Sequence, residues 1–590
     1  MTVDNADVGL NYKTGEIANA TLRVDEALQQ CNEWVQDGGS ECEVFFPRGM
    51  YFYGFGGIRV PPRTTLKGEA AELVSILFYE QDNGTTLFNP NAGGAPGCKS
   101  HKYGGQGPWN SFCSNGYIFN GGESLALQDL TIYVTKYHEE VIHITNSVSF
   151  VMSGVRIRAL PFFALSVIEA APEELGGFHN RYAPYSFKDI GTVILIENST
   201  NFRIVNSDVY GLGHVIQCNN VSGGIIAYNR LRGGQAPGLV NAYSMIVEHN
   251  YMESTWEGSS FYFKYGYHTY HAFNTEKHVY VGDREGFTYD NPGRSMMAMI
   301  ITDAGGTSIS LSAPFGSDNW SGFSDVGNGT IDSVDGMQHV LILLNGTGAP
   351  QYRFILSMAS PGVFEIDSPF AQHTAVAGAY VGVNVVKAQN IHLANFHQDT
   401  GHFQFFNGAI DTVIAENVGS RMGGFFTWGQ VHAPSSFFQN GFVMSASYWM
   451  AFVDNEIMEG NSVKNYVGGA AFKSSSTSST RPPTPNASMW RYQFNGGSIG
   501  CITQTFGSPF PTIPSTAFLI FRRNRIHSNG AIMIGSTHET YDDNPHALGS
   551  NFVCEHNTVE RSPLCVVVNS RFTQVTTRGN ICTPELLQDS

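Results

Sequence analysis

The chain has 590 residues, a net charge of −17, 14% charged residues, 13% aromatic residues and 65 glycines. This composition is typical of a β-rich, turn-rich protein and excludes a helical bundle or a disordered chain. The negative charge argues against nucleic acid as a partner, because phosphate binding requires a basic surface, and the sequence holds no run of about 18 apolar residues that would predict a membrane span.

The N-terminal residues lack the basic and apolar segments of a secretory signal. Two features nevertheless favour a secreted protein whose signal has been removed. Sequons of the form Asn-X-Ser/Thr predict a glycoprotein; they begin at Asn19, Asn83, Asn198, Asn220, Asn319, Asn328, Asn345 and Asn486. Close cysteine pairs on loops predict disulfides, with buried free thiols as the alternative; the candidates are Cys31 with Cys42, Cys98 with Cys113, and the group Cys554, Cys565 and Cys582.

The segment TLRVDEALQQCNEWVQDGG, which starts at residue 21, predicts an amphipathic helix. Its apolar residues recur at helical spacing, and Gly38 and Gly39 provide a stop. These apolar residues are Leu22, Ala27, Leu28, Cys31, Trp34 and Val35. We assign residues 1–40 to an N-terminal segment and capping helix, which would cover the open end of a repeating β-structure.

The next segment carries three short motifs in a row. They are VFFPRGMY at 44–51, IRVP at 58–61 and TLKGE at 65–69. This arrangement resembles the entry coil of pectate-lyase-superfamily proteins and phage tailspikes, in which V-x-F-P-x-G-x-Y, I-x-V-P and T-x-L-x-G follow a cap helix. The resemblance implies a right-handed parallel β-helix. It implies contact with carbohydrate less specifically, because that superfamily contains lyases, hydrolases, epimerases, adhesins and structural proteins.

An asparagine ends one short apolar strand after another along the chain. These residues are Asn206, Asn229, Asn250, Asn274, Asn395, Asn417, Asn455, Asn524, Asn557 and Asn580. The regular steps, of 21 to 24 residues, match one β-helix coil of three strands and three turns. Stacked Asn side chains can hydrogen-bond from coil to coil, and Asn tolerates the left-handed backbone of a tight corner. We therefore predict an all-β fold, a right-handed parallel β-helix solenoid, because no helical periodicity supports a leucine-rich or helical repeat.

A long interruption separates Asn274 from Asn395. Within it, alternating apolar residues joined by Gly and Asn turns predict further strands. We interpret residues 301–380 as a small β-strand insertion on the side of the column. It divides the β-helix into a first part, 41–300, and a second part with the C-terminal cap, 381–590.

Polar residues follow the Asn positions at similar offsets, so we expect them in a column on one face. They are His214, Gln235, Glu257, Asp283, Arg284, Glu285 and His402. A sugar unit spans about 5 Å, close to the spacing of stacked parallel strands, so such a column would bind a polysaccharide subsite by subsite. A hydrogen-bonded structural role is the alternative for His214 and His402.

The densest group of ionisable residues is HVYVGDREGFTYD, residues 278–290. Glycoside hydrolysis needs two carboxylates, and we predict that they come from Asp283, Glu285, Asp290 and, one coil earlier, Glu257. Arg284 would keep one carboxylate ionised while crowding raises the pKa of another. An internal salt-bridge network and a non-catalytic ligand contact are the alternatives.

The remaining residues predicted to contact substrate are Arg284, His214, Gln235, Trp256, Glu253 and His402. Tyr251 and Glu253 alternate on one short strand and should point to the same side. The aromatic residues of 251–273 fit either a stacking platform for sugars or the β-helix core.

The predicted function is a secreted glycoside hydrolase that acts on a polysaccharide with a carboxylate pair and without a cofactor or metal. One alternative is a polysaccharide lyase on a uronate-containing chain, which would use a base such as His214 or Arg284 and Ca²⁺. Another is a non-catalytic glycan-binding or structural surface protein. Nothing in the sequence indicates an oligomeric state.

Overall fold

The computed structural model describes most of the chain. The described residues are 20–53, 58–78, 118–134, 140–159, 192–211, 214–233, 237–254, 261–277, 285–289, 296–302, 305–315, 320, 338–371, 376–385, 387–405, 408–432, 443–460, 497–506, 513–527, 530–535, 549–562, 564–568 and 572–583. They form two compact units, residues 1–262 with 272–283, and residues 263–271 with 284–590. No helix of the described part is long and apolar enough to cross a membrane.

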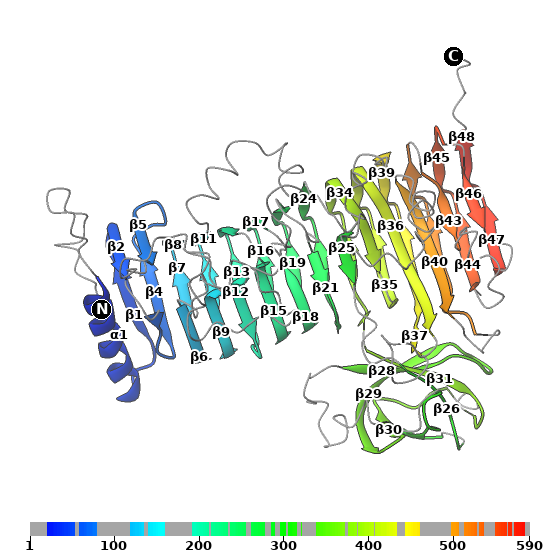
Figure 1. Ribbon diagram of the computed structural model, residues 1–590, viewed down its shortest axis with the longest axis horizontal. Coiled ribbons are helices and arrows are strands. Elements are labelled where there is room, and N and C mark those ends of the chain that lie inside the picture. The colour runs from blue at the N-terminus through cyan, green and yellow to red at the C-terminus, as the bar shows by residue number, and fades with distance from the viewer. Residues whose placement is uncertain are drawn as a thin grey trace, which may run out of the picture. The chain divides into compact units, whose positions relative to one another are not determined.

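The first unit is a column of coils in which each coil gives one strand to each of three parallel sheets (Figure 1). Sheet I contains β3 (Ile58–Arg59), β6 (Ile118–Glu123), β9 (Glu140–Val148), β12 (Thr192–Glu197), β15 (His214–Ser222) and β18 (Gly238–Tyr243). Sheet II contains β1 (Cys42–Phe46), β4 (Thr64–Gly68), β7 (Ala126–Gln128), β10 (Val151–Ser153), β13 (Arg203–Val205), β16 (Ile225–Ala227) and β19 (Ile246–Glu248). Sheet III contains β2 (Gly49–Tyr53), β5 (Val74–Phe78), β8 (Thr131–Val134), β11 (Arg156–Ala159), β14 (Asp208–Gly211), β17 (Arg230–Gly233), β20 (Tyr251–Ser254) and β24 (Thr275–Lys277).

The register of the strands confirms the predicted fold class, a right-handed parallel β-helix. Arg203 pairs with Ile225, and Ile225 pairs with Ile246, so equivalent positions recur once per coil. Inward-facing residues stack in rows, and Ile142, Ile194 and Ile216 form one row that is fully buried. Rows of this kind fill the interior because side chains of a strand alternate between its two faces.

A buried ladder of Asn side chains runs along the corner between sheets II and III. In the first unit, the backbone N–H and the Nδ2 of Asn229 both donate to Asn250 Oδ1, and those of Asn250 donate to Asn274 Oδ1, each at 3.0 Å. In the second unit, the same bonds join Asn395, Asn417, Asn455, Asn524, Asn557 and Asn580. The predicted ladder is therefore confirmed at nine of its ten positions.

The remaining predicted position, Asn206, is one residue before the true ladder position. Asn229 Oδ1 accepts the backbone N–H of Ser207, at 2.9 Å, so Ser207 holds the ladder position in its coil. Asn206 holds the corner position before it, where φ is 49°. The ladder Asn was also expected to adopt the left-handed backbone of the corner, and this expectation was wrong. The residue with the left-handed backbone is the one that precedes the ladder Asn, as at Tyr228 and His249.

The predicted capping helix is α1 (Thr21–Gln36). It buries Val24, Ala27, Leu28, Cys31 and Val35. The Cys31–Cys42 disulfide connects it to β1, and Tyr53 donates to Asp25 Oδ1 at 2.7 Å. Leu22 and Trp34 are exposed, contrary to the helical pattern, and the Trp34 indole instead donates to the Glu41 carbonyl beyond the end of the helix.

The second unit continues the three-sheet coil. Sheet I contains β25 (Glu285–Tyr289), the ends of β34 (Phe396–Phe405) and β36 (Val418–His432), β40 (Ser498–Phe506), β43 (Ile532–Ile534) and β46 (Val566–Val568). Sheet II contains β22 (Gly266–Tyr267), β32 (Lys387–Ala388), β33 (Ile391–Leu393), β35 (Ala409–Ala415), β38 (Ser447–Val453), β41 (Thr516–Arg522), β44 (Gly549–Glu555) and β47 (Thr573–Arg578). Sheet III contains the starts of β34 and β36, β39 (Glu456–Gly460), β42 (Arg525–Ile526), β45 (Thr558–Glu560) and β48 (Ile581–Thr583). β37 (Val443–Ser445) pairs antiparallel with the end of β36, and β21 (Phe261–Phe263) and β23 (Tyr270–Ala272) contain residues of both units.

An antiparallel sheet interrupts the second unit. Its strands are β26 (Met296–Met299), β27 (Ser308–Ser310), β28 (His339–Leu343), β29 (Gln351–Ser360), β30 (Val363–Ile366) and β31 (Tyr380–Val385). Leu341 and Leu343 of β28 face the sheet's own core, whereas Val340 and Ile342 pack with Ile410 of the β-helix. The sheet is therefore attached to the coils by an apolar interface.

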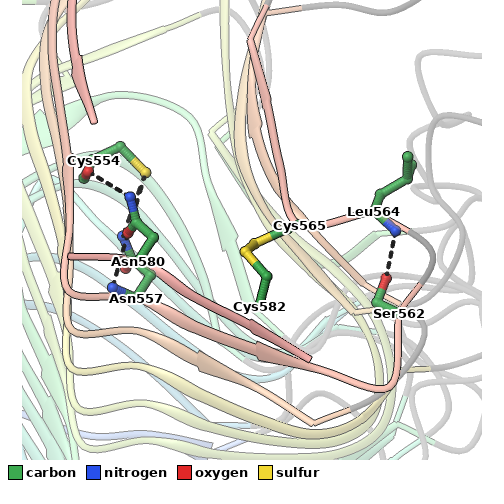
Figure 2. Close-up of a disulfide and its surroundings, with 7 residues drawn as sticks. All are labelled: Cys554, Asn557, Ser562, Leu564, Cys565, Asn580 and Cys582. Carbon is green, nitrogen blue, oxygen red and sulfur yellow. Dashed lines mark hydrogen bonds between the residues drawn. A yellow bond between two sulfur atoms is a disulfide. The ribbon is translucent and has the colours of Figure 1, made fainter. Parts of the chain in front are cut away.

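A second disulfide lies in the last described coils (Figure 2). Cys565, just before β46, is bonded to Cys582 of β48. The Asn557–Asn580 step of the ladder lies beside the Cys554 thiol, which is buried and has its pKa raised to about 12 by that burial. The described residues thus contain both predicted forms of cysteine, two disulfides and three buried free thiols. The predicted pair Cys98 and Cys113 lies outside the described residues.

Candidate functional site

The outer face of sheet I in the first unit carries a row of polar side chains. Their strands alternate, so that Ile142 and Ile194 face the core while His143 and Glu197 face outward. Leu195 pairs with both His143 and Gln217, and Glu197 pairs with Asn219. The row therefore comes from three consecutive coils, through β9, β12 and β15.

Hydrogen bonds connect the side chains of His143, Glu197, Asn219 and Gln217 in one continuous row. His143 Nε2 lies 3.1 Å from Glu197 Oε2, and Asn219 Nδ2 donates to Glu197 Oε1 at 3.1 Å. Gln217 Nε2 donates to Asn219 Oδ1 at 2.8 Å. The His143 and Glu197 side chains are 29% and 34% exposed, so the pair is accessible from solvent.

The arrangement suits proton transfer and recognition of hydroxyl groups. A carboxylate bound to one ring nitrogen of a His orients the imidazole and stabilises its protonated form, as in general acid–base sites. The two amides offer donors and acceptors beside it. Gln217 lies over the next coil, where a Cβ on Gly238 would come within 2.3 Å of Gln217 Oε1, so the glycine makes room for this side chain.

A second amide ladder borders this face. Asn220 Nδ2 donates to Asn198 Oδ1 at 3.2 Å, and Asn241 Nδ2 donates to Asn220 Oδ1 at 2.9 Å. All three residues have positive φ, between 49° and 54°. Asn198 and Asn220 begin two of the sequons, and a glycan on Asn220 would be attached to the same Nδ2 that donates its ladder bond.

Most of the residues that we predicted to act on substrate lie outside the described residues. They are Gln235, Trp256, Glu257, Asp283, Arg284 and Asp290. Glu285 is the first residue of β25 and pairs with His402 of β34, although its side chain is not among those described. Their predicted roles stay predictions.

The three other predicted residues lie in different surroundings. His214 begins β15, where it pairs with Thr192 of β12 on sheet I. His402 is buried, 4% exposed, with its ring edge-on to Phe426 at 5.5 Å. Glu253 lies on sheet III and accepts from the Tyr251 hydroxyl at 3.4 Å, so the two do point to the same side. Burial, and secondly the Glu253 charge, raises the pKa of Tyr251.

Sequence reasoning missed His143 and Glu197. Both alternate with buried apolar residues, in VIHIT and ILIEN, which is the signal that an outward polar position leaves. They were missed because 54 residues separate them, although the strands that carry them are neighbours. The repeat step of about 22 residues does not predict that these two residues are neighbours.

Within the described part of the chain, no group of three or more His, Cys, Asp or Glu side chains is placed to hold a metal ion. The Ca²⁺ site that a lyase would use therefore stays a prediction tied to that alternative.

The coil pairing defines a right-handed parallel β-helix with a polar row on one outer face. No family model and no curated protein matches the chain. Among solved structures, it is similar to the A-module of mannuronan C-5 epimerase AlgE6 from Azotobacter vinelandii, with 8% identity over 99% of both chains and a TM-score of 0.39.

Two further solved structures are similar at comparable levels. A GH87 α-1,3-glucanase catalytic unit from Streptomyces thermodiastaticus strain HF3-3 has 9% identity over 98% of this chain and 68% of that chain, with a TM-score of 0.40. An exopolygalacturonase from Thermotoga maritima has 8% identity over 96% of this chain and 88% of that chain, with a TM-score of 0.33. At these identities and TM-scores, the likeness is no argument about the reaction of this chain.

Proposed function

We propose that this chain is a secreted carbohydrate-active protein that cleaves a polysaccharide bound along the outer face of sheet I. The observation that carries this proposal is the hydrogen-bonded row of His143, Glu197, Asn219 and Gln217 on three consecutive coils. Coils stack about 4.8 Å apart, close to the length of one sugar unit, so each coil faces one subsite. The two disulfides favour an oxidising, extracellular compartment.

The first candidate reaction is hydrolysis by the carboxylates of Glu257, Asp283, Glu285 and Asp290. Two carboxylates flanking the glycosidic bond supply the general acid and the base or nucleophile. Glu285 begins β25, which pairs with β34 in sheet I of its unit.

The second candidate is elimination on a uronate-containing chain. It is favoured by the His143–Glu197 pair, because an imidazole oriented by a carboxylate is a suitable base for removing a proton next to a uronate carboxyl group. In this reaction the C–H electron pair forms a C=C bond, the glycosidic oxygen leaves and takes up a proton, and the product is an unsaturated sugar.

A single assay separates the candidates. The protein is incubated with a panel of neutral and acidic polysaccharides, and new reducing ends are measured beside the ultraviolet absorbance of unsaturated products. The variants are Asp283→Asn, Glu285→Gln, His143→Gln and Glu197→Gln. The control is Arg203→Gln, which changes an exposed residue of sheet II.

Hydrolysis predicts reducing ends without absorbance, lost in the Asp283 and Glu285 variants. Elimination predicts both signals, lost in the His143 and Glu197 variants. Glycan binding without either signal, weakened by Glu197→Gln, would support the non-catalytic alternative on the same face. A protein that neither binds nor cleaves any glycan of the panel would contradict the proposal.

A further inference from the structure

A groove of about 710 Å³ runs along the corner between sheets II and III in the first unit. It is lined by Glu69, Ala70, Ala71, Glu72, Asp129, Gly154, Arg156, Asn206, Ser207, Asp208, Tyr228 and Arg230. None of these residues belongs to the polar row on sheet I, so the groove is a separate feature of the surface.

The floor of the groove follows from the corner residues of successive coils. The register places Asp129, Gly154, Asn206 and Tyr228 at equivalent corners, each with φ between 49° and 66°. The first three have short side chains or none, which leaves the corner open. Tyr228 is the first large side chain in the series, and it closes one end.

One face of the Tyr228 ring is available to the groove. On the side of the following coils, the ring stacks on His249 at 4.8 Å and 4°, and His249 stacks on Phe273 at 5.0 Å and 12°. On the side of the preceding coils, the neighbouring corner residue is Asn206, which also lines the groove. Tyr228 is 57% exposed. It therefore presents an aromatic face, held by two further rings, to whatever occupies the groove.

The side wall carries a charged row in register. Arg156, Asp208 and Arg230 pair with one another across β11, β14 and β17. Arg156 forms an ion pair with Glu72, and Asp208 is shared by Arg158 at 2.6 Å and Arg232 at 3.3 Å.

Arg230 differs from the other arginines of this wall. Among the described residues it forms no ion pair, and its guanidinium lies 5.5 Å from the Tyr251 ring. The acidic residues at the other end of the groove are Glu69, Glu72 and Asp129, of which Glu69 is paired with Arg48 and Glu72 with Arg156. The end of the groove next to Tyr228 therefore offers a guanidinium that no carboxylate of the described residues pairs, in a chain whose net charge is −17.

We propose that this groove binds an anionic oligosaccharide, independently of the catalytic site. One sugar ring stacks on the open face of Tyr228, and its carboxylate or sulfate pairs with Arg230. Carbohydrate C–H groups pack on aromatic faces, and guanidinium groups bind such anions with two parallel hydrogen bonds. Further sugar units follow the corner toward Gly154 and Asp129, about one unit per coil. The groove would hold an acidic polymer on one face while another face acts on it.

The test compares oligosaccharides of equal length that carry uronate carboxylates, sulfates or no charge. Binding is measured by isothermal titration calorimetry in a background that combines Glu197→Gln, Asp283→Asn and Glu285→Gln, so that neither candidate reaction consumes the ligand. We expect at least one of the two anionic classes to bind about tenfold or more tighter than the neutral one, with an affinity that falls as salt is added. Which class binds identifies the anionic group.

Three variants test the contacts. Arg230→Gln should remove the preference for the anionic ligand, and Tyr228→Ala should weaken anionic binding about tenfold or more, whereas Tyr228→Phe should retain it because it keeps the ring face. Arg203→Gln, on sheet II, is the matched control for loss of one positive charge. Thermal unfolding of each variant establishes that the fold is intact.

Equal binding of neutral and anionic ligands, no binding of any, or unchanged binding in Arg230→Gln would each overturn the proposal. A comparison with the protein that retains Glu197 separates it from the catalytic proposal. If binding depends on Glu197 rather than on Tyr228 and Arg230, the ligand lies on sheet I and the groove is not its site.

Discussion

His143 Nε2 and Glu197 Oε2 lie 3.1 Å apart although 54 residues separate them in the chain. They meet because β9 and β12 are neighbouring strands of sheet I, in which Glu197 pairs with Thr145, two positions from His143. Both side chains face outward on the same surface, and Asn219 of the next coil holds the second carboxylate oxygen.

If elimination is the reaction, His143→Gln and Glu197→Gln should each lower kcat about 10²–10⁴-fold, the usual contribution of a general acid–base group. The double variant should be little worse than the His143 variant alone, because Glu197 acts through the imidazole. Initial rates of unsaturated product on the best substrate of the panel check this. Full additivity of the two losses would show that the residues act separately.

The Asn ladder should contribute strongly to stability. Asn455 is fully buried, accepts from the backbone and side chain of Asn417, and donates to the Ile414 carbonyl at 2.8 Å. Asn455→Ala leaves these groups unpaired, and each such group costs about 1–3 kcal/mol. We expect a marked fall in the thermal unfolding midpoint, measured by circular dichroism.

The matched control for the ladder is Glu416→Ala, at the exposed corner residue that precedes Asn417. It alters a coil corner without touching a ladder bond, and should leave the midpoint nearly unchanged. Equal effects of the two substitutions would show that the corner backbone, and not the buried amide, determines the stability.

The disulfide Cys565–Cys582 should stabilise the last coils. It closes a loop with a sequence separation of 17 residues, and a cross-link of this length contributes about 3 kcal/mol by restricting the unfolded chain. Cys565→Ser with Cys582→Ser should therefore make β46 and β48 exchange their amide hydrogens faster, as measured by mass spectrometry. Cys554→Ser, at a buried free thiol in the same region, is the comparison. Faster exchange in Cys554→Ser but not in the double variant would contradict the expectation.

Acid should weaken one ion pair network, in which a buried carboxylate contacts two exposed arginines. The Glu555 carboxylate is 3% exposed and contacts Arg522 and Arg578. The Arg578 hydrogen bond is the largest of the causes that hold the pKa of Glu555 below its usual value of 4.5. Because the folded-state pKa is the lower one, this contribution to stability is complete above pH 4.5 and is lost as the pH falls through the folded-state value.

The measurement is the unfolding midpoint of the wild type and of Glu555→Gln across acidic and neutral pH. The difference between them should be largest near neutral pH and shrink below pH 4.5. Glu459→Gln, at an exposed residue of β39, should show no such trend. A difference for Glu555→Gln that does not change with pH would mean that packing, and not charge, is responsible.

Several features were predictable because each coil repeats the same local sequence pattern. An apolar strand followed by Asn recurs along the chain, at steps of 21 to 24 residues where no longer segment intervenes, and the structure has the ladder at those residues, from Asn229 to Asn580. The one-residue error at Asn206 arose because Ser207 replaces the Asn in that coil. Helical spacing identified α1, but it did not foresee that Leu22 and Trp34 face away from the first coil.

The sequence by itself determined the coil, since the period of apolar strands and buried amides is local information that each repeat carries. It also identified Cys31 with Cys42 as a pair, but not which two of Cys554, Cys565 and Cys582 form the second disulfide. Only the tertiary structure decided which outward side chains meet, because unequal coil lengths change the spacing between them. Glu197 reaches His143 across 54 residues, and Asp208 reaches Arg158 across 50. Neither separation is one coil step, so contacts on the outer faces depend on stacking in space rather than on distance along the chain.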